Sequence, residues 1–346
     1  MNFSDILHKI SDRTALTGRE ASAALQMILH GEVPDMQIAA FLFGMRSKGE
    51  TIEELTAFVQ TMRDHAVKLD VNTDGAVDLC GTGGDHAGTF NISTAAMFVV
   101  AGAGVPVLKH GNRSISSKSG SYDVLVELGV QPSLEPAKVK VCFEQTRMAF
   151  MFAPLFHPAM KFVMPARKTL AMRTFFNILG PLVNPAGVKR QVIGAYNRQT
   201  AHDMSRILAN LDTDYAITLH AHDGLDEVSL SALTDTFEMK HRVSSEGVRF
   251  DPTQLGYQMF DESEFKGGDA AENAAIIRAI LSNKATAAQN GIVELNAAFG
   301  IMASGKADSL IQAQRMARES LATGAALHAL NSFADCTTQL DSESLS

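Results

Sequence analysis

The fold of this chain is decided by three neighbouring segments: DLCGTGGD at residues 78–85, TFNIST at 89–94 and KHGNRSISS at 109–117. The first and third segments begin in short apolar runs that predict β-strands, and the first leads into a helical pattern. Glycines let backbone N–H groups approach an oxygen closely, and a helix start adds unpaired donors and the positive end of the helix dipole. The pattern therefore predicts two phosphate-binding loops, to which hydroxyl groups and Lys109 add further donors.

The familiar nucleotide-binding motifs do not match these glycines. Gly81, Gly83 and Gly84 resemble the start of the dinucleotide motif G-x-G-x-x-G, but the sixth position is His86. The P-loop pattern G-x-x-x-x-G-K-[ST] is also absent from the region. Because glycine turns between strands and helices are common, one such loop alone is weak support for a site. Two in tandem, the second with a lysine, an arginine and three serines, favour a functional site.

These segments closely resemble those of the anthranilate phosphoribosyltransferases of tryptophan biosynthesis. The central matches are Gly81-Thr82-Gly83-Gly84-Asp85, Thr89-Phe90-Asn91-Ile92-Ser93-Thr94, Lys109-His110-Gly111-Asn112-Arg113 and Ser116-Ser117. Later matches are FAP at 152–154, HPAMK at 157–161, Pro165, RK at 167–168, RT at 173–174, FN at 176–177, LGP at 179–181, NP at 184–185 and DEVS at 226–229. The resemblance runs in order from the first helix to about residue 330, and its central motifs are specific.

The resemblance implies an Mg²⁺-dependent pentosyltransferase. Such an enzyme joins the amine of anthranilate to C1 of 5-phosphoribosyl 1-pyrophosphate and releases pyrophosphate. The residues implied to bind phosphoribosyl pyrophosphate are Gly81, Gly84, Asp85, Thr89, Asn91, Ile92, Ser93, Thr94, Lys109, His110, Gly111, Asn112, Arg113, Ser114, Ile115, Ser116, Ser117 and Ser121. For Asn91 and Ser93 a second interpretation stays open, in which the side chain only caps the following helix.

The metal ligands implied by the resemblance are Asp226 and Glu227, with Ser93 as a third contributor. Magnesium prefers oxygen ligands and usually takes one or two carboxylates together with substrate phosphates. Two adjacent acids are more often a solvated surface, so the family match carries this hypothesis. Tetrahedral zinc is disfavoured, because His220 and His222 have no cysteines at a suitable spacing.

Arg167 is the residue expected to bind the carboxylate of anthranilate. A guanidinium group can hold a carboxylate through two parallel hydrogen bonds, which fixes the orientation of the ring. The resemblance implies that Gly81, Asn112 and His110 also contact anthranilate. His110 could act as a general base, but an arylamine is already neutral, so a positioning role is favoured.

Composition restricts the class of protein. The chain has 346 residues, of which 46% are hydrophobic and 20% charged, with a net charge of -8 and a pI near 5.8. This acidic balance argues against a general nucleic-acid binder. Three cysteines without C-x-x-C spacing favour a reducing compartment, and catalysis by Cys80 is not expected. Without a signal-peptide pattern or a membrane-length apolar run, a cytoplasmic protein that does not bind membranes is expected.

The pattern along the chain predicts a small N-terminal helical domain and a large α/β domain with a mostly parallel, mixed sheet covered by helices. Residues 1–70 show only helical periodicity, with capping boxes Thr17-x-x-Glu20 and Thr51-x-x-Glu54. Strands and helices alternate in residues 71–346, which predicts right-handed crossovers. The resemblance implies that about 165–185 returns to join the N-terminal helices.

Three further expectations concern single segments. Residues 167–179 read as one helix, which Ala171, in place of a glycine usual in the family, would stiffen. Residues 235–267 read as antiparallel strands, and the polar tail after Phe333 is expected to be frayed. The apolar stripe of the N-terminal helices is either core or partner surface, and the resemblance suggests a homodimer through these helices.

Two other functions remain possible from the sequence. A pyrimidine-nucleoside phosphorylase of similar architecture would use phosphate and a nucleoside, but the intact second loop and Arg167 argue against it. A non-catalytic, nucleic-acid-binding relative of the same fold is disfavoured by the acidic balance and the complete set of expected ligands.

Overall fold

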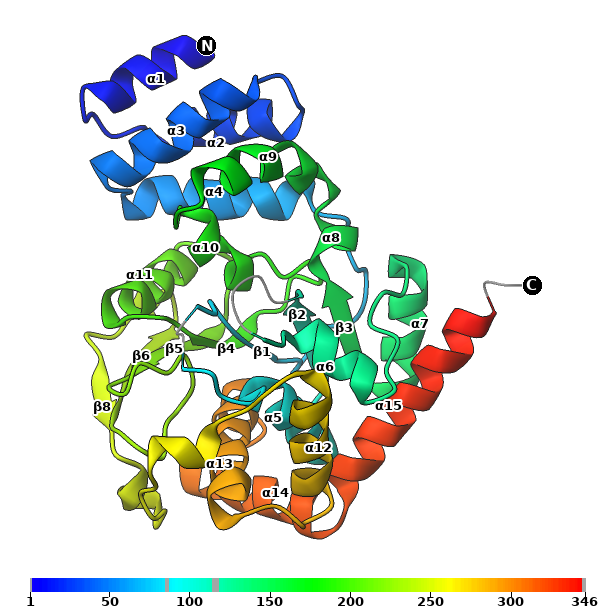
Figure 1. The fold of residues 1–346 in the computed structure, drawn as a ribbon. Coiled ribbons are helices and arrows are strands. Elements are labelled where there is room, and N and C mark those ends of the chain that lie inside the picture. Colours follow the sequence, from blue (N-terminus) through cyan, green and yellow to red (C-terminus); the bar gives the residue numbers. More distant parts are fainter. Residues whose placement is uncertain (1, 85–86, 114–117, 344–346) are drawn as a thin grey trace.

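The computed structural model describes residues 2–84, 87–113 and 118–343. Four helices form its N-terminal end: α1 (Phe3–Ser11), α2 (Gly18–Leu29), α3 (Asp35–Lys48) and α4 (Ile52–His65). They lie together at one end of the molecule (Figure 1). Both predicted capping boxes are confirmed, because Thr17 and Thr51 each accept from the backbone three residues later while Glu20 and Glu54 bond back. These caps satisfy N–H groups that would otherwise be unpaired at the helix starts.

The strands of the large domain form two sheets in the described part of the chain. The main sheet has the order β1 (Asp78–Gly81), β4 (Arg190–Gly194), β5 (Tyr215–Ala221), β6 (Thr234–Lys240) and β7 (Val243–Ser244), with β8 (Val248–Phe250) also pairing with β6. Strands β1, β4 and β5 are parallel, whereas β6 to β8 are antiparallel additions. The second sheet is the parallel pair β2 (Val107–Gly111) and β3 (Met148–Phe152). The predicted mixed α/β architecture is confirmed.

Helices surround both sheets. They are α5 (Ile92–Gly102), α6 (Ser121–Glu127), α7 (Pro136–Thr146), α8 (Ala153–Phe156), α9 (Met164–Leu170), α10 (Phe176–Leu179), α11 (Arg198–Ala209), α12 (Ala270–Leu281), α13 (Ala287–Ser304), α14 (Leu310–Ala322) and α15 (Ala325–Ser342), with short 3-10 turns at Pro158–Phe162, Gly180–Leu182, Pro252–Leu255 and Glu262–Phe265. Helix α5 is apolar on almost every side because α13, α14 and α15 all pack around it. Helix α11 covers the other side of the main sheet (Figure 1).

Strands β1 and β2 are connected by side-chain hydrogen bonds rather than by a regular ladder of backbone hydrogen bonds. The strands are bridged at Val77 and Val107, but the next groups are bonded differently. The amide Nδ2 of Asn184 donates to Leu108 O at 2.9 Å and to Asp78 Oδ2 at 2.8 Å, and the other carboxylate oxygen of Asp78 accepts from the His110 backbone at 3.3 Å. Lys109 Nζ donates to Leu79 O. Strands β1 and β2 therefore belong to separate sheets, and they separate at the point where both glycine loops begin.

The buried apolar residues of the described chain form two clusters. One is centred on α5 and the strands around it. The other joins α1–α4 to Val163–Val183 and includes Phe58 stacked on Phe175 at 4.4 Å between ring centroids. This second cluster continues onto the face of β4–β6 that α11 covers. We propose that residues 1–70 with about 165–185 form one domain and 71–346 the other, a boundary that stays a prediction.

Three local predictions were wrong in whole or in part. The stretch 167–179 is not one helix, because Ala171 ends α9 in a left-handed conformation with φ of 48° and α10 starts only at Phe176. A glycine would adopt this conformation without strain, so Ala171 introduces strain at a helix end and cannot stiffen a continuous helix. The tail is also ordered, since α15 continues to Ser342 and buries Phe333, Cys336 and Leu340. Beyond Phe250 the expected antiparallel strands give way to 3-10 turns.

None of the helices in the described part of the chain is long and apolar enough to cross a membrane.

Candidate active site

The backbone of the first glycine loop contacts Asp226, an acidic residue far away in the sequence. Gly83 and Gly84 both have positive φ, 63° and 73°, which glycine adopts at little cost. The N–H of Gly83 donates to Asp226 Oδ2 at 2.8 Å, although 143 residues separate the two. Asp85, predicted to bind the substrate, lies outside the described residues.

Two glycines without side chains make room for Asp226. Gly81 and Gly194 are register partners at the ends of β1 and β4. A Cβ on Gly194 would lie 1.5 Å from the backbone oxygen of Asp226, and one on Gly81 would lie 2.4 Å from Asp226 Oδ2. From the other side, the buried amide of Asn296 accepts from Val228 N at 2.9 Å and donates to Val228 O at 2.8 Å. The acidic turn is thus fixed against the carboxyl ends of the parallel strands.

Glu227 lies at the start of helix α5. Its Oε1 accepts from the N–H of Ser93 at 3.0 Å, and Lys109 Nζ donates to Ser93 Oγ at 3.3 Å. Burial, and then the neighbouring negative charge of Asp226, raise the pKa of Glu227 well above its usual range. A site that holds two carboxylates close together against their mutual repulsion is one that a cation would stabilise.

The predicted magnesium ligands fit that ion. Asp226, Glu227 and Ser93 supply only oxygen atoms, which Mg²⁺ prefers. No group of three or more histidine, cysteine or acidic side chains arranged for a metal is found within 2–84, 87–113 and 118–343. Two carboxylates without a complete protein cage suit an ion that keeps waters and shares substrate phosphates. His220 and His222, considered for zinc, instead bond to Ala195 O and Asp235.

The second loop is partly described. Lys109 and His110 are buried at the end of β2, and Asn112 and Arg113 follow at the surface. Arg113 lies over the ring of Tyr122, with 4.3 Å from its guanidinium carbon to the centroid. The hydroxyl of Ser121 donates to Asn112 O at 3.4 Å. The predicted ligands Ser114, Ile115, Ser116 and Ser117 lie outside the described residues.

Gly111 and the start of α5 complete the neighbourhood of the loops. A Cβ on Gly111 would lie 2.6 Å from Ser121 Oγ, so the close approach of the two requires glycine. Asn91 is the residue before α5, but its side chain makes no capping bond. Instead, its Nδ2 donates to Ser119 O at 3.3 Å and its Oδ1 accepts from Asn273 at 3.0 Å. The capping interpretation is therefore wrong for Asn91.

The remaining predicted phosphate ligands differ in exposure. Thr89 is partly exposed and forms an isolated bridge with Lys266, whereas Ile92 and Thr94 are buried. Buried Ile92 and Thr94 can offer a ligand little more than their backbone.

His110 has one nitrogen bonded and one without a partner. Its Nδ1 lies 3.2 Å from Gly180 O, a group that can only accept, so Nδ1 carries the proton. Its Nε2 is buried and has no hydrogen-bond partner among the residues described. Burial, helped by His157 at 5.2 Å between ring centroids, lowers the pKa of His110 to about 3. His110 is therefore neutral and presents a lone pair on Nε2.

Arg167 is half-buried, and burial lowers its pKa. Its guanidinium carbon lies 5.3 Å from the ring centroid of Phe176, and it forms no ion pair with a carboxylate of the described residues. Phe176 belongs to α10, whose C-cap, Gly180, accepts from His110. Through α10, Arg167 is thus linked to one of the predicted phosphate ligands.

The segment 180–185, which follows α10, connects the site to both domains. Its carbonyl groups accept from side chains of separate elements: Gly180 O from His110, Pro181 O from Gln191, Leu182 O from Arg63 and Val183 O from His157. Arg63 belongs to α4 of the N-terminal helices and is half-buried, and burial of its guanidinium group lowers its pKa to about 10. One irregular segment therefore ties α4 to the residue that we expect at the anthranilate site.

Several residues of the site were missed by sequence reasoning. Asp78, Asn184 and Asn296 are polar residues in apolar surroundings, which was the available signal, and Gly194 ends β4. Arg173, to which the sequence assigned no role, donates to Gly84 O at 2.5 Å and lies over the ring of Tyr196. Burial and the nearby Asp78 raise the pKa of the Cys80 thiol, which disfavours the reactive thiolate.

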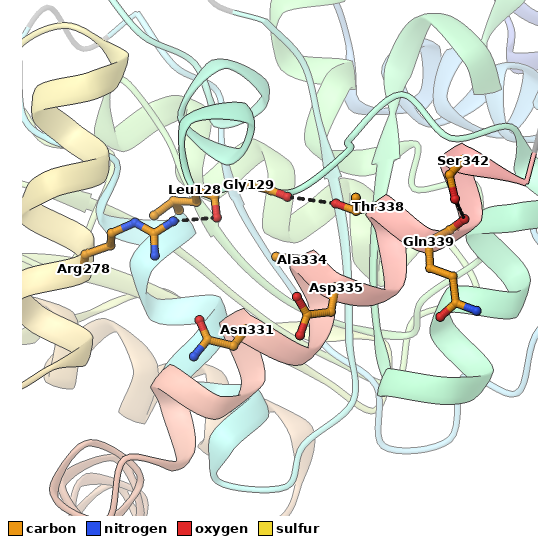
Figure 2. A pocket seen from close by; sticks show the side chains of 9 residues that line it. All are labelled: Leu128, Gly129, Arg278, Asn331, Ala334, Asp335, Thr338, Gln339 and Ser342. Atoms are coloured by element: carbon orange, nitrogen blue, oxygen red, sulfur yellow. Dashed lines mark hydrogen bonds between the residues drawn. The ribbon is translucent and has the colours of Figure 1, made fainter. Parts of the chain in front are cut away.

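A cavity of about 660 Å³ lies away from these residues. It is bounded by α15, the end of α12 and the turn after α6 (Figure 2). Arg278 donates to Leu128 O at 2.9 Å across one wall, and Thr338 to Gly129 O at 3.4 Å across another. None of the predicted site residues lines it, so cavity size alone would mark the wrong place.

Comparison with known protein families matches both parts of the chain. Residues 73–327 match the family described as "Glycosyl transferase family, a/b domain", and residues 4–66 match "Glycosyl transferase family, helical bundle domain".

Individual relatives are similar over nearly their whole length. The anthranilate phosphoribosyltransferase of Salinibacter ruber is 48% identical over 348 residues, covering 98% of this chain and 99% of the relative. That of Alkaliphilus metalliredigens is 44% identical and covers 96% and 98%. Among solved structures, the enzyme of Thermus thermophilus superposes with a TM-score of 0.90 at 34% identity, covering 96% and 99%. The Saccharomyces cerevisiae enzyme in complex with PRPP and Mg shares the fold, with a TM-score of 0.88 at 24% identity over 97% and 98%.

Gly194→Ala should displace the acidic turn, because the new methyl group would overlap the backbone of Asp226. We expect the free energy of unfolding, measured with urea, to fall by at least about 1–3 kcal/mol. The amides of 226–228 should exchange faster with solvent. Gly18→Ala is the control, since its Cβ would meet neighbours no closer than 3.4 Å. Unchanged stability and exchange in Gly194→Ala would contradict the packing described here.

His110 predicts a specific dependence of stability on pH. The folded imidazole stays neutral until pH approaches about 3, whereas an unfolded one is protonated below about 6.5. Between these values the unfolded state binds one more proton, so the free energy of unfolding falls as pH is lowered, by about 1.4 kcal/mol per pH unit. His110→Gln should remove the contribution of one proton from this slope. The slope is obtained by measuring the free energy of unfolding in urea at several pH values between about 4 and 6. Equal slopes in both proteins would show that His110 is protonated when folded.

Proposed function

The chain belongs to the anthranilate phosphoribosyltransferase family, and from this premise we propose how its residues carry out the reaction. The enzyme transfers the phosphoribosyl group of 5-phosphoribosyl 1-pyrophosphate to the amine of anthranilate and releases pyrophosphate, in tryptophan biosynthesis. The site is assigned from the contacts of two acidic residues. Asp226 accepts from Gly83 N–H in the first glycine loop, and Glu227 accepts from Ser93 N–H at the start of α5. Family membership decides against the nucleoside phosphorylase and nucleic-acid-binding alternatives.

Phosphoribosyl pyrophosphate is bound by the two glycine loops. Its ligands are Gly81, Gly84, Thr89, Asn91, Ile92, Ser93, Thr94, Lys109, His110, Gly111, Asn112, Arg113 and Ser121, together with Asp85 and Ser114–Ser117 on the sequence alone. The positive φ of Gly84 and the start of α5 support this assignment, since both direct backbone donors toward an anion. Lys109 adds a positive charge beside Ser93.

Magnesium is held by Asp226, Glu227 and Ser93. The fit of this oxygen-only set and the raised pKa of Glu227 support the assignment, as does the solved complex of the yeast enzyme with PRPP and Mg. When bound, the ion supplies positive charge for the departing pyrophosphate. The protein's own part is to keep both carboxylates in place, through Gly83 N–H on Asp226 and Ser93 N–H on Glu227.

Anthranilate is oriented by Arg167, His110, Asn112 and the backbone of Gly81. The half-buried guanidinium of Arg167 pairs with the carboxylate; it forms no ion pair with a protein carboxylate of the described residues and so is available for this role. Nε2 of His110 accepts a hydrogen bond from the arylamine. This contact directs the lone pair of the amine nitrogen toward C1. A neutral imidazole held in one tautomer by Gly180 O suits positioning of the amine.

Catalysis then rests on positioning and electrostatics. As pyrophosphate leaves, C1 becomes oxocarbenium-like, and the amine attacks from the opposite face. No covalent enzyme intermediate is required, since well-oriented reactants supply about 7–11 kcal/mol. Each preorganised donor adds roughly 2.7–4 kcal/mol.

The protein acts as a cytoplasmic homodimer that pairs through its N-terminal helices. Two apolar side chains of α3 support this part of the proposal, since Met36 is 84% exposed and Phe43 56% exposed. The cytoplasmic location rests on three cysteines that are all free thiols.

The activity is tested by the loss of anthranilate fluorescence. We expect the signal to fall only when phosphoribosyl pyrophosphate and Mg²⁺ are both present, and pyrophosphate to accumulate in equal amount. Loss of signal without the ribosyl donor, or phosphorolysis of thymidine in its place, would overturn the proposed function.

Arg167→Ala should raise the KM for anthranilate by about 10–100-fold, the value of a charge-assisted hydrogen bond of about 1.5–3 kcal/mol. The KM for phosphoribosyl pyrophosphate should change little, because Arg167 is assigned to anthranilate and lies against Phe176 of α10. Lys168→Ala, which removes an exposed neighbouring cation, is the matched control. If Arg167→Ala weakens both substrates equally in steady-state kinetics, the carboxylate assignment is wrong.

A further inference from the structure

Two histidines of the helical domain meet outside the site described above. His30 follows α2 as its C-cap and His65 ends α4, and their Nε2 atoms are 3.3 Å apart. The ring centroids are 5.2 Å apart with planes tilted by 51°. The side chain of His30 is 54% exposed, so solutes can reach the pair.

When both rings are neutral, the two Nε2 atoms can form a hydrogen bond only if His30 carries its proton on Nε2. His65 Nδ1 lies 2.8 Å from Thr61 O, which only accepts, so its proton is on Nδ1 and its Nε2 carries a lone pair. His30 Nδ1 faces the Glu32 carboxylate at 3.7 Å. If His30 protonates Nδ1 toward Glu32, two Nε2 lone pairs face each other. If it protonates Nε2 instead, a lone pair faces a carboxylate.

A cation between the two Nε2 atoms removes the conflict, and the spacing indicates its size. Two nitrogens bound about 2.0–2.1 Å from one tetrahedral Zn²⁺ lie about 3.3 Å apart. If both rings point at a common centre, the observed centroid and Nε2 distances of 5.2 and 3.3 Å place it about 2 Å from each nitrogen. The groups that face the two Nδ1 atoms, Thr61 O and the Glu32 carboxylate, also fit a metal site. Metal-bound histidines usually donate their second N–H to a carbonyl or carboxylate.

We propose that His30 and His65 form a binding site for a divalent transition-metal ion such as Zn²⁺. Imidazole nitrogen suits Zn²⁺, whereas Mg²⁺ prefers oxygen, so this site and the carboxylate site take different ions. Since the described residues contain no group of three metal-binding side chains, water completes the coordination. A bound ion ties the ends of α2 and α4 together just before the linker, where Val67 N donates to Phe156 O at 2.8 Å.

Zinc binding to tag-free protein tests the proposal, with excess Mg²⁺ present to occupy the carboxylate site. In calorimetric titrations, wild type should bind one more Zn²⁺ than His30→Ala/His65→Ala. Each single variant should lose more than about tenfold in affinity at this site, since even outer-shell partners are worth about 10–100-fold. Zn²⁺ should raise the Tm of wild type but not of the double variant.

His8→Ala is the matched control, because His8 is an exposed histidine of the same helical domain. It should keep the wild-type stoichiometry. Circular dichroism and Tm without metal should be the same for all variants, which separates lost binding from lost folding. Identical Zn²⁺ isotherms for wild type and the double variant would overturn the proposal, as would a loss of binding in His8→Ala equal to that of the double variant.

Discussion

The rest of the structure depends on the buried polar contact between Asp78 and Asn184. Strands β1 and β2 start as neighbours, yet beyond Val77 their facing groups bond to side chains. Burial raises the pKa of Asp78 to about 6, and the positive charge of Lys109 opposes that shift. Such a cluster is stable only while each member is satisfied, because an unpaired buried polar group costs its full desolvation. Next to this cluster, the side chain of Lys109 reaches Leu79 O and Ser93 Oγ, and that of His110 reaches Gly180 O.

The same contact links the site to the helical domain. Asn184 belongs to the connector 180–185, whose carbonyl groups bond to side chains of β2, β4 and α4. A connector without regular structure must find partners for its backbone elsewhere, and here the partners come from both domains. A shift of α4 relative to the sheet would therefore act on Gly180 and on the tautomer and position of His110. The proposed anthranilate side of the site would therefore respond to a movement of α4.

The phosphate side depends instead on close packing of the backbone. Asp226 reaches the first loop because Gly81 and Gly194 have no side chains, and Asn296 holds Val228 two residues later. The result is a pair of carboxylates that repel each other at the start of α5. The local energetic cost of bringing them together is what a bound cation removes, so the affinity for the ion is prepared by the fold.

The sequence by itself determined the local features. Glycine spacing in 78–85 and 109–117, the capping boxes at Thr17 and Thr51, and the alternation of strands and helices each depend on residues close together in the chain. With the family resemblance, they were enough for the fold class and the reaction. Only the tertiary structure decided the divided sheet, the tautomer of His110, the need for glycine at position 194 and the burial of α15. These features arise from contacts between residues such as Asp78 and Asn184, which lie 106 positions apart and leave no local periodicity to detect.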